Sequence, residues 1–288
     1  MNKVAVIAVS GNALASEGGG TSIPDQALAA ARTAQYVVDI AAAEVPVVPM
    51  DYATADTQGA IGVMFQRAFI NELNRRGLKK PVATVVTQVR VDPADKAFAN
   101  PTKPIGSIMT KDVADALAKR NGWSLMEEPG RGWRRCVASP QPQEVIEVET
   151  VRALLGSGHI VIACGGGGIP VVTDATGSLT SREAVIDKDL ASSLLARQLE
   201  AGKLLIATAV PRVAINFGKP DVKWLSRLPL AEAARYMDEG HFGKGSMGSK
   251  VAAVMEYVAA CDDEGIITDI ENMGKAIAGE AGTRIVRG

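Results

Sequence analysis

The residues best suited to chemistry in this chain are four consecutive glycines and a set of lysines in turn sequences. Gly165, Gly166, Gly167 and Gly168 directly follow an apolar segment, residues 159–163, that is expected to be a strand. Bare backbone N–H groups in such a turn can close around a small anion such as a phosphate or a carboxylate. A flexible surface loop is the alternative, but the apolar residues on both sides of the run favour a binding loop.

Three lysines lie in sequences that restrict them. Lys103 lies in Asn-Pro-Thr-Lys-Pro-Ile-Gly, Lys188 lies in Val-Ile-Asp-Lys-Asp-Leu-Ala, and Lys250 opens a helix after a glycine-rich turn. A lysine in a loop is usually only solvated, but turn residues and apolar neighbours surround each of these. Phosphoryl transfer needs such parts, because it depends on cations and backbone N–H donors around the transferring group. Asp189, at the start of a helix, either orients two lysines or simply suits the helix dipole.

The composition argues against several other functions. A net charge of −1 and a pI near 6.2 give no electrostatic case for nucleic-acid binding. The three cysteines form no CxxC pair, so they argue against a zinc site or a disulfide framework and suit a reducing compartment. No apolar run approaches the roughly 18 residues of a membrane helix. The N-terminus has a strand pattern rather than a signal peptide, so we expect a cytoplasmic protein without a membrane partner.

Two catalytic motifs are also unsupported. The two histidines, His159 and His241, have no serine or cysteine nucleophile motif nearby, so a hydrolytic triad is not expected. Residues 243–248 fit GxGxxG, but they follow a helix, whereas the dinucleotide motif needs a strand before it. We interpret this match as accidental for NAD.

Strands and helices that alternate along the chain must position the glycines and lysines. Residues 4–9 form a continuous apolar run, as expected for a strand buried on both faces. Further strands are expected over 82–91, 159–163, 204–208, 265–268 and 283–286, and helices over 25–44, 59–76, 111–120, 147–155, 187–199, 231–239 and 250–260. This alternation predicts an α/β fold with a mainly parallel sheet covered on both faces. The helix over 59–76 carries one apolar face, formed by Ile61, Met64, Phe65, Ala68 and Phe69.

The middle of the chain changes character between residues 92 and 145. This stretch holds Asp92-Pro93, Pro129-Gly130 and Pro140-Gln141-Pro142, with few long periodic runs between them. That density of turns predicts an inserted subdomain over 92–145, within a single domain that spans residues 1–288.

Motifs over nearly the whole chain carry a resemblance to a known family. They are Ser10–Leu14, Thr57–Gly62, Val82–Val89, Asn100–Gly106, Gly130–Arg135, Cys164–Pro170, Glu183–Ala191, Ile215–Pro220, Glu239–Phe242, Gly245–Val251 and Ala281–Val286. In these motifs the chain resembles the carbamate kinase family, within the amino acid kinase superfamily. A glycine run followed by Ile169-Pro170 is characteristic of this family within the superfamily.

The resemblance implies an open αβα sandwich of the amino acid kinase type, with a small inserted subdomain, usually found as a homodimer. It implies reversible phosphoryl transfer between ATP and carbamate, which gives carbamoyl phosphate and ADP, with Mg²⁺ accompanying the nucleotide. A place in arginine metabolism goes with that reaction. No protein residue is expected to be a dedicated metal ligand.

The resemblance also implies roles for particular residues. Lys103 would reach the phosphoryl group from the subdomain, and Lys188 and Lys250 would contact the ATP phosphates, with Asp189 positioning them. The small substrate would be held by Gly11, Asn12, Gly165, Gly166, Gly167 and Gly168. The nucleotide would be bound by Ser10, Ala209, Val213, Gly245, Ser246 and Met247.

Three departures from the family pattern bear on activity. The family opens with two glycines before the asparagine, and Ser10 replaces the first of them. The family has Thr-Asp-Val-Asp after a strand near the nucleotide, and this chain has Thr208-Ala209-Val210-Pro211, which removes two carboxylates. Last, a strand and a turn reading His-Gly-Asn-Gly-Pro-Gln-Val-Gly are absent where Glu44 runs directly into Val45.

The third departure leaves two explanations open. Either the sequence omits a segment between Glu44 and Val45, or the protein lacks it and is catalytically weakened. An Ala-rich helix that ends abruptly without a cap favours an omission. The alternatives to a carbamate kinase-like enzyme are a divergent paralogue that binds nucleotide or a small anion in a regulatory or assembly role, and a kinase for another small carboxylate or carbamate.

Overall fold

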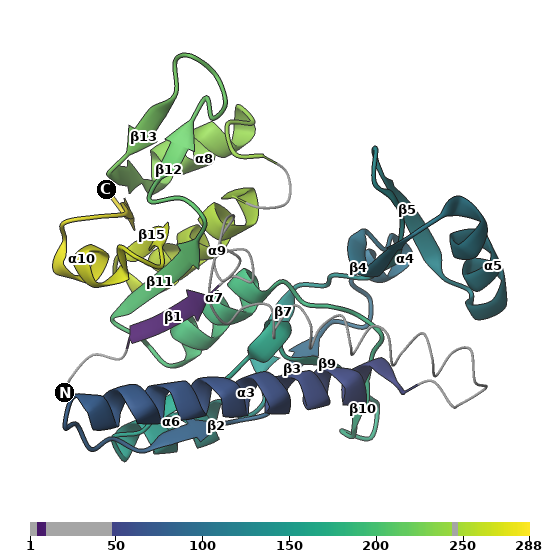
Figure 1. Ribbon diagram of the computed structural model, residues 1–288, viewed down its shortest axis with the longest axis horizontal. Helices are drawn as coiled ribbons and strands as arrows, with labels where there is room; N and C mark the ends of the chain where they lie inside the picture. Colours follow the sequence, from purple (N-terminus) through teal and green to yellow (C-terminus); the bar gives the residue numbers. More distant parts are fainter. Residues whose placement is uncertain (1–4, 10–47, 244–246) are drawn as a thin grey trace.

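The computed structural model describes residues 5–9, 48–243 and 247–288 of the chain. The helix expected over 25–44 and the junction between Glu44 and Val45 lie outside the described residues. Ser10, Gly11, Asn12, Gly245 and Ser246 also lie outside them. Within the described part, helices and strands alternate as expected for an α/β fold (Figure 1).

A mainly parallel sheet forms one half of the molecule. Its five described strands lie in the order β1 (Ala5–Val9), β11 (Lys203–Thr208), β15 (Gly265–Asp269), β16 (Thr283–Val286) and β14 (Arg227–Pro229). β11 runs parallel to both β1 and β15, whereas β15 and β16 are antiparallel. Leu204, Leu205 and Ile206 on β11 are fully buried, as expected for a central strand covered on both faces.

Helices and a small hairpin complete this half. The elements are α7 (Lys188–Gln198), α8 (Leu230–Asp238), α9 (Met247–Cys261), α10 (Met273–Ala278), β12 (Val213–Ile215) and β13 (Lys223–Leu225). Val251, Val254 and Val258 lie at helical spacing on α9 and are fully buried in the core. On α7, Leu194 and Leu195 are buried in a second core cluster. Both helices therefore bury apolar residues against the core.

The other half contains two smaller sheets. One has the described strand order β10 (Leu179–Ser181), β9 (Ile169–Thr173), β3 (Gln88–Val91) and β7 (Pro142–Val145); the other pairs β2 (Val82–Thr84) with β8 (Ile160–Ile162) in parallel. The helices α3 (Met50–Arg75) and α6 (Val148–Gly156) pack here. The expectation of one strand over 82–91 is wrong. The chain leaves β2 after Thr84 and enters a different sheet at Gln88, because residues 85–87 turn to meet the glycine run.

A separate three-stranded sheet projects from the body of the molecule (Figure 1). Its strand order is β4 (Lys103–Met109), β6 (Gly132–Val137) and β5 (Ser124–Glu128), with α5 (Lys111–Asn121) beside it and α4 (Lys96–Ala99) before it. These elements lie within the stretch 92–145. The last strand of that stretch, β7, pairs with β3 of the four-stranded sheet.

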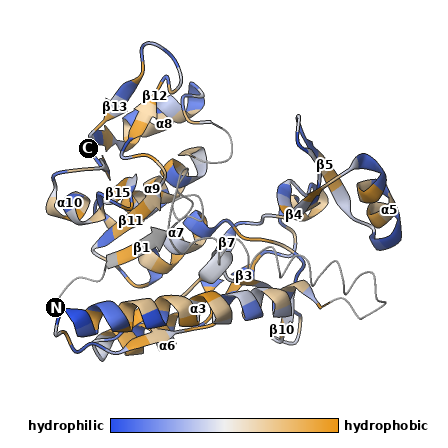
Figure 2. Ribbon diagram, viewed as in Figure 1, coloured by the Kyte–Doolittle hydropathy of each residue, from blue (hydrophilic) through white to orange (hydrophobic). Residues whose placement is uncertain are grey.

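The long helix α3 starts nine residues before the helix expected over 59–76. Its apolar face is largely exposed: Ile61, Met64 and Phe69 are each more than 40% accessible. Figure 2 shows apolar residues along this helix. The buried positions of α3 are instead Gln58 and Gly62, which face the glycine run and β2. Among the described residues, no helix is both long and apolar enough to cross a membrane.

Candidate active site

The glycine run folds as a tight loop between β8 and β9. Gly165–Gly167 form a single 3-10 turn, and Cys164, Gly166, Gly167 and Gly168 all have positive φ, between 54° and 104°. A Cβ atom on Gly167 would lie 2.3 Å from the carbonyl oxygen of Ile186, and one on Gly168 would lie 2.4 Å from Cγ2 of Val89. A Cβ on Gly166 would meet no described atom within 4 Å. Gly167 and Gly168 are therefore needed for packing, and Gly166 lies on the open side.

Hydrogen bonds within the protein already occupy several N–H groups of this loop. The Gly167 N–H donates to the carbonyl of Cys164 at 3.0 Å, and the Gly168 N–H donates to that of Gly165 at 3.1 Å. The Cys164 N–H donates to Oγ1 of Thr87 at 3.0 Å. An anion bound by this loop would therefore be held by the N–H groups of Gly165 and Gly166.

Gln58 and Thr87 support the glycine loop from outside it. The buried Gln58 amide donates to the carbonyl of Thr87 at 3.1 Å and accepts from the Thr87 N–H at 2.9 Å. A Cβ on Gly165 would lie 3.1 Å from Cγ of Gln58, so the glutamine fits closely against the loop. Sequence reasoning missed both residues. Gln58 lies in the motif Thr57–Gly62 and Thr87 in the motif Val82–Val89, and these family motifs were the only sequence feature that pointed to them.

The N-terminus of α7 gathers the charged residues. Asp187 is its N-cap, and its carboxylate accepts from the N–H of Asp189 at 2.9 Å and from Nζ of Lys103 at 3.1 Å. Asp189 Oδ2 accepts from Nζ of Lys250 at 2.8 Å and lies 3.8 Å from Nζ of Lys188. The structure therefore brings Lys103, Lys188, Lys250 and Asp189 together. The packing of Gly167 against Ile186 places the glycine loop beside them.

The lysines of this cluster differ in exposure. Lys250 and Asp189 are almost fully buried, at 4% and 1% exposed, whereas the side chains of Lys103 and Lys188 are about one third exposed. A buried charge needs a partner and further hydrogen bonds. Among the described residues, the second oxygen of Asp189, Oδ1, is buried without a hydrogen-bond partner. The exposed lysines can contact a ligand directly, while Lys250 is fixed by Asp189.

Electrostatics favour an ionised Asp187 carboxylate at this helix start. Burial of the Asp187 carboxyl raises its pKa. The charge of Lys103, the N–H of Asp189 and the charge of Lys188 lower the pKa, and together they outweigh the effect of burial. The pKa of Asp187 is therefore held below its ordinary value. The carboxylate stays ionised and keeps its hold on Lys103 at neutral pH.

The residues expected at the nucleotide are only partly described. Ala209 is exposed at the end of β11, and Met247 is the first residue of α9 and packs against the core. The Val213 side chain is fully buried in the core, with its N–H bound to Oγ1 of Thr283, so only its backbone could meet a base. Ser10, Gly245 and Ser246 lie outside the described residues.

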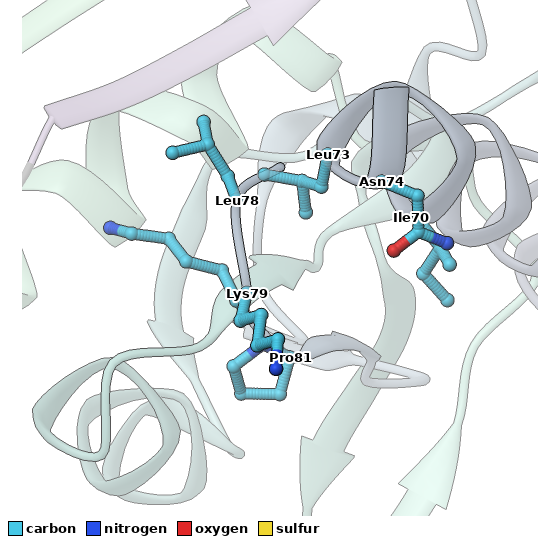
Figure 3. Close-up of a pocket in the computed structure, with 7 residues that line it drawn as sticks. Ile70, Leu73, Asn74, Leu78, Lys79 and Pro81 are labelled. Carbon is cyan, nitrogen blue, oxygen red and sulfur yellow. The ribbon is translucent and has the colours of Figure 1, made fainter. Parts of the chain in front are cut away.

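A hollow of about 320 Å³ lies elsewhere, at the C-terminal end of α3 (Figure 3). It is lined by Ile70, Leu73, Asn74, Leu78, Lys79, Lys80 and Pro81. None of the expected site residues lines it, so we assign the chemistry to the charged cluster and the glycine loop. In the described part of the chain, no three His, Cys, Asp or Glu residues stand close enough to hold a metal ion.

The fold and site define an amino acid kinase. The model of the amino acid kinase family matches residues 3–269, and the chain belongs to this family. Within it, the chain is 48% identical to carbamate kinase from Thermococcus kodakarensis over 243 residues, which cover 84% of this chain and 77% of that protein. The solved structure of carbamate kinase from Giardia lamblia bound to AMP-PNP superposes with a TM-score of 0.84, at 35% identity, over 99% of this chain and 98% of that one. The chain is thus a carbamate kinase-like, ATP-dependent phosphotransferase.

A third relative covers both chains almost completely. The carbamate kinase-like protein YqeA of Escherichia coli is 44% identical, over 99% of this chain and 99% of that protein. Their alignment extends over 315 positions, which exceeds the 288 residues of this chain by 27. At least 27 positions of the alignment are therefore gaps in this chain, opposite residues of YqeA.

Proposed function

We propose that the protein transfers a phosphoryl group reversibly between ATP and carbamate, giving carbamoyl phosphate and ADP. The observation that carries this proposal is the convergence of Lys103, Lys188 and Lys250 on two carboxylates beside the glycine loop. Three cations and a set of backbone donors suit a transferring phosphoryl group, whose charge is spread over its oxygens. None of the described groups in this cluster is a serine, cysteine or histidine nucleophile, so positioning and charge would supply catalysis.

Each described residue has a definite task in this proposal. Lys103, from the projecting sheet, and Lys188 would contact the transferring group and the nucleotide phosphates. Asp189 would hold Lys250 in a fixed position, because both side chains are buried and form an ion pair with each other. The Gly165 and Gly166 N–H groups would hold the small substrate. Mg²⁺ would enter as MgATP, neutralising phosphate charge, since Asp187 and Asp189 are already paired with lysines.

The test is turnover by the purified protein. ATP formation from ADP and carbamoyl phosphate would be followed for the wild type and for Lys103→Ala. We expect the variant to lose about a hundredfold in kcat, as when one charge-stabilising donor is removed from an active site. Lys119→Ala is the matched control, because Lys119 is an exposed lysine of α5 in the same projecting unit, and it should keep wild-type activity.

A second candidate is a divergent paralogue that binds nucleotide or a small anion without efficient turnover. Two observations favour it: at least 27 positions of the alignment with YqeA have no counterpart here, and the family's turn is absent where Glu44 runs into Val45. Ser10, Ala209 and Pro211 point the same way. This candidate predicts measurable ADP binding with no ATP formation. In either case, we propose a cytoplasmic homodimer; the carbamate reaction would place it in arginine metabolism.

A further inference from the structure

We propose that Arg135 and Glu183 position Lys103, by tying the projecting sheet to the segment that leads into α7; the proposal rests on the proposed phosphoryl transfer. The Arg135 guanidinium on β6 forms an ion pair with the carboxylate of Glu183. Glu183 lies four residues before Asp187, which binds Lys103. Two ion pairs therefore connect the same strand pair to the same short segment.

The strand register explains why both pairs point the same way. Lys103 on β4 lies opposite Val137 on β6, and Ile105 lies opposite Arg135. Residues two apart on a strand, and residues directly opposite on neighbouring strands, share one face of a sheet. Lys103 and Arg135 are therefore diagonal neighbours on one face. Their carboxylate partners, Glu183 and Asp187, follow each other along the facing segment.

Main-chain contacts also join the projecting unit to the body at this junction. The Val185 N–H donates to the carbonyl of Ala138 at 2.9 Å, and Ala138 and Ala184 form an isolated parallel bridge. Beside this bridge lies a cavity of about 180 Å³, lined by Trp123 and Arg135 of the projecting unit and by Glu183 of the body. Phe98 of α4 also packs against the second core cluster, but a cavity occupies part of the junction, so we infer that the ion pairs help to fix the orientation of the sheet.

Arg135 differs from an ordinary surface arginine. Its guanidinium lies 4.5 Å from the ring centre of Trp123, and its side chain is only 17% exposed. Stacking fixes the guanidinium before it meets Glu183, so the pair loses less side-chain entropy than two flexible partners would. The adjacent Arg134 pairs instead with Glu128, inside the projecting unit. Glu128 also pairs with Arg131 of the same unit, so changing it provides a control that disturbs two ion pairs without touching the junction.

The kinetic test compares two carboxylate-to-amide changes, Glu183→Gln and Glu128→Gln, in the wild type and in Lys103→Ala. We expect Glu183→Gln to lower kcat by about twofold to fivefold, the upper part of the range for one exposed ion pair, with the KM for ADP unchanged. In Lys103→Ala, the same change should have no further effect, because the residue it positions is gone. An equal loss from Glu128→Gln, or an undiminished loss in Lys103→Ala, would overturn the proposal.

Hydrogen exchange tests the junction without any turnover. Glu183→Gln should speed exchange of the Val185 N–H, relative to the wild type and to Glu128→Gln, and the swap Arg135→Glu with Glu183→Arg should restore slow exchange. Unchanged exchange at Val185 would refute the tether. If the wild type makes no ATP, the proposed function fails, and exchange alone then decides whether the junction is held as described.

Discussion

Alanine at Gly166 or at Gly167 gives the most informative test of how the glycine loop is built. Both residues have positive φ, 68° and 104°, so alanine costs about 1–2 kcal/mol at either position. At Gly167 the new methyl would also lie 2.3 Å from the Ile186 carbonyl oxygen, and such overpacking adds about 1–3 kcal/mol. At Gly166 no described atom lies within 4 Å, so the backbone term stands alone.

These terms predict a clear separation between the two variants. Gly166→Ala should lose about 1–2 kcal/mol of unfolding free energy and Gly167→Ala about 2–5 kcal/mol, out of a typical total of about 5–15 kcal/mol. Urea denaturation followed by circular dichroism measures both. Gly177→Ala is the control, since Gly177 has φ of 86° and open space but lies in the turn between β9 and β10.

Activity should separate Gly166→Ala from the control Gly177→Ala. The Gly166 methyl would stand on the open side, where the small substrate is proposed to bind. We therefore expect Gly166→Ala to lose about tenfold or more in kcat/KM for carbamoyl phosphate, a cost of at least about 1.4 kcal/mol. Gly177→Ala should retain wild-type kinetics. If Gly166→Ala were as unstable as Gly167→Ala, or fully active, the assignment of the open side would be wrong.

Three further predictions concern ionisable groups. Lys250→Met should destabilise the protein by about 3–5 kcal/mol in urea denaturation, because it removes the buried cation that binds Asp189 and leaves only the more distant Lys188, 3.8 Å away; adding Asp189→Leu should recover part of the loss. Because burial raises the pKa of the Cys164 thiol to about 12, iodoacetamide at pH 8 should modify Cys164 only after unfolding, and mass spectrometry would detect the adduct. Folding lowers the pKa of Asp187, so the ionised carboxylate stabilises the protein fully above its ordinary pKa of about 3.9. This stabilisation is lost as the pH falls through the pKa of the folded state. Asp187→Asn should therefore flatten the fall in unfolding free energy measured between pH 6 and pH 3.

The apolar patterns of the sequence correctly predicted several of the buried strands and helices. The strands β1 and β11 and the helices α7 and α9 agree with expectation within a few residues, since a continuous apolar run or a helical stripe needs only local sequence to be recognised. The grouping of the lysines also followed from their motifs. The motifs could not distinguish Lys250, which is buried, from Lys103, whose side chain is about one third exposed.

The errors arose where a distant residue decides the local structure. The run over 82–91 is apolar enough for one strand, but Thr87 leaves the ladder to bond Gln58, which lies 29 residues away. On α3, periodicity selected the apolar face, whereas the helix buries Gln58 and Gly62. A Cβ on Gly62 would lie 2.2 Å from Thr84, so close packing placed a glycine there. A local pattern reports only where apolar residues recur, so it cannot predict that the Gln58 amide is buried by its hydrogen bonds to Thr87.

The glycines themselves show the same limit. Four in succession predicted a loop for a small anion, but the sequence could not say that Gly167 and Gly168 are required by Ile186 and Val89. Only the structure separates the two packing glycines from the open Gly166. The loop consequently has two packed glycines and an open Gly166, rather than four equivalent donors.

The central claim is that this chain catalyses phosphoryl transfer, and ATP formation tests it most directly. The purified protein would be mixed with millimolar ADP, Mg²⁺ and carbamoyl phosphate, and ATP would be measured against Lys103→Ala and a protein-free blank. The proposed function predicts ATP formation well above both. ATP at the level of the blank, from protein that still binds ADP by calorimetry, would contradict it and favour the non-catalytic paralogue.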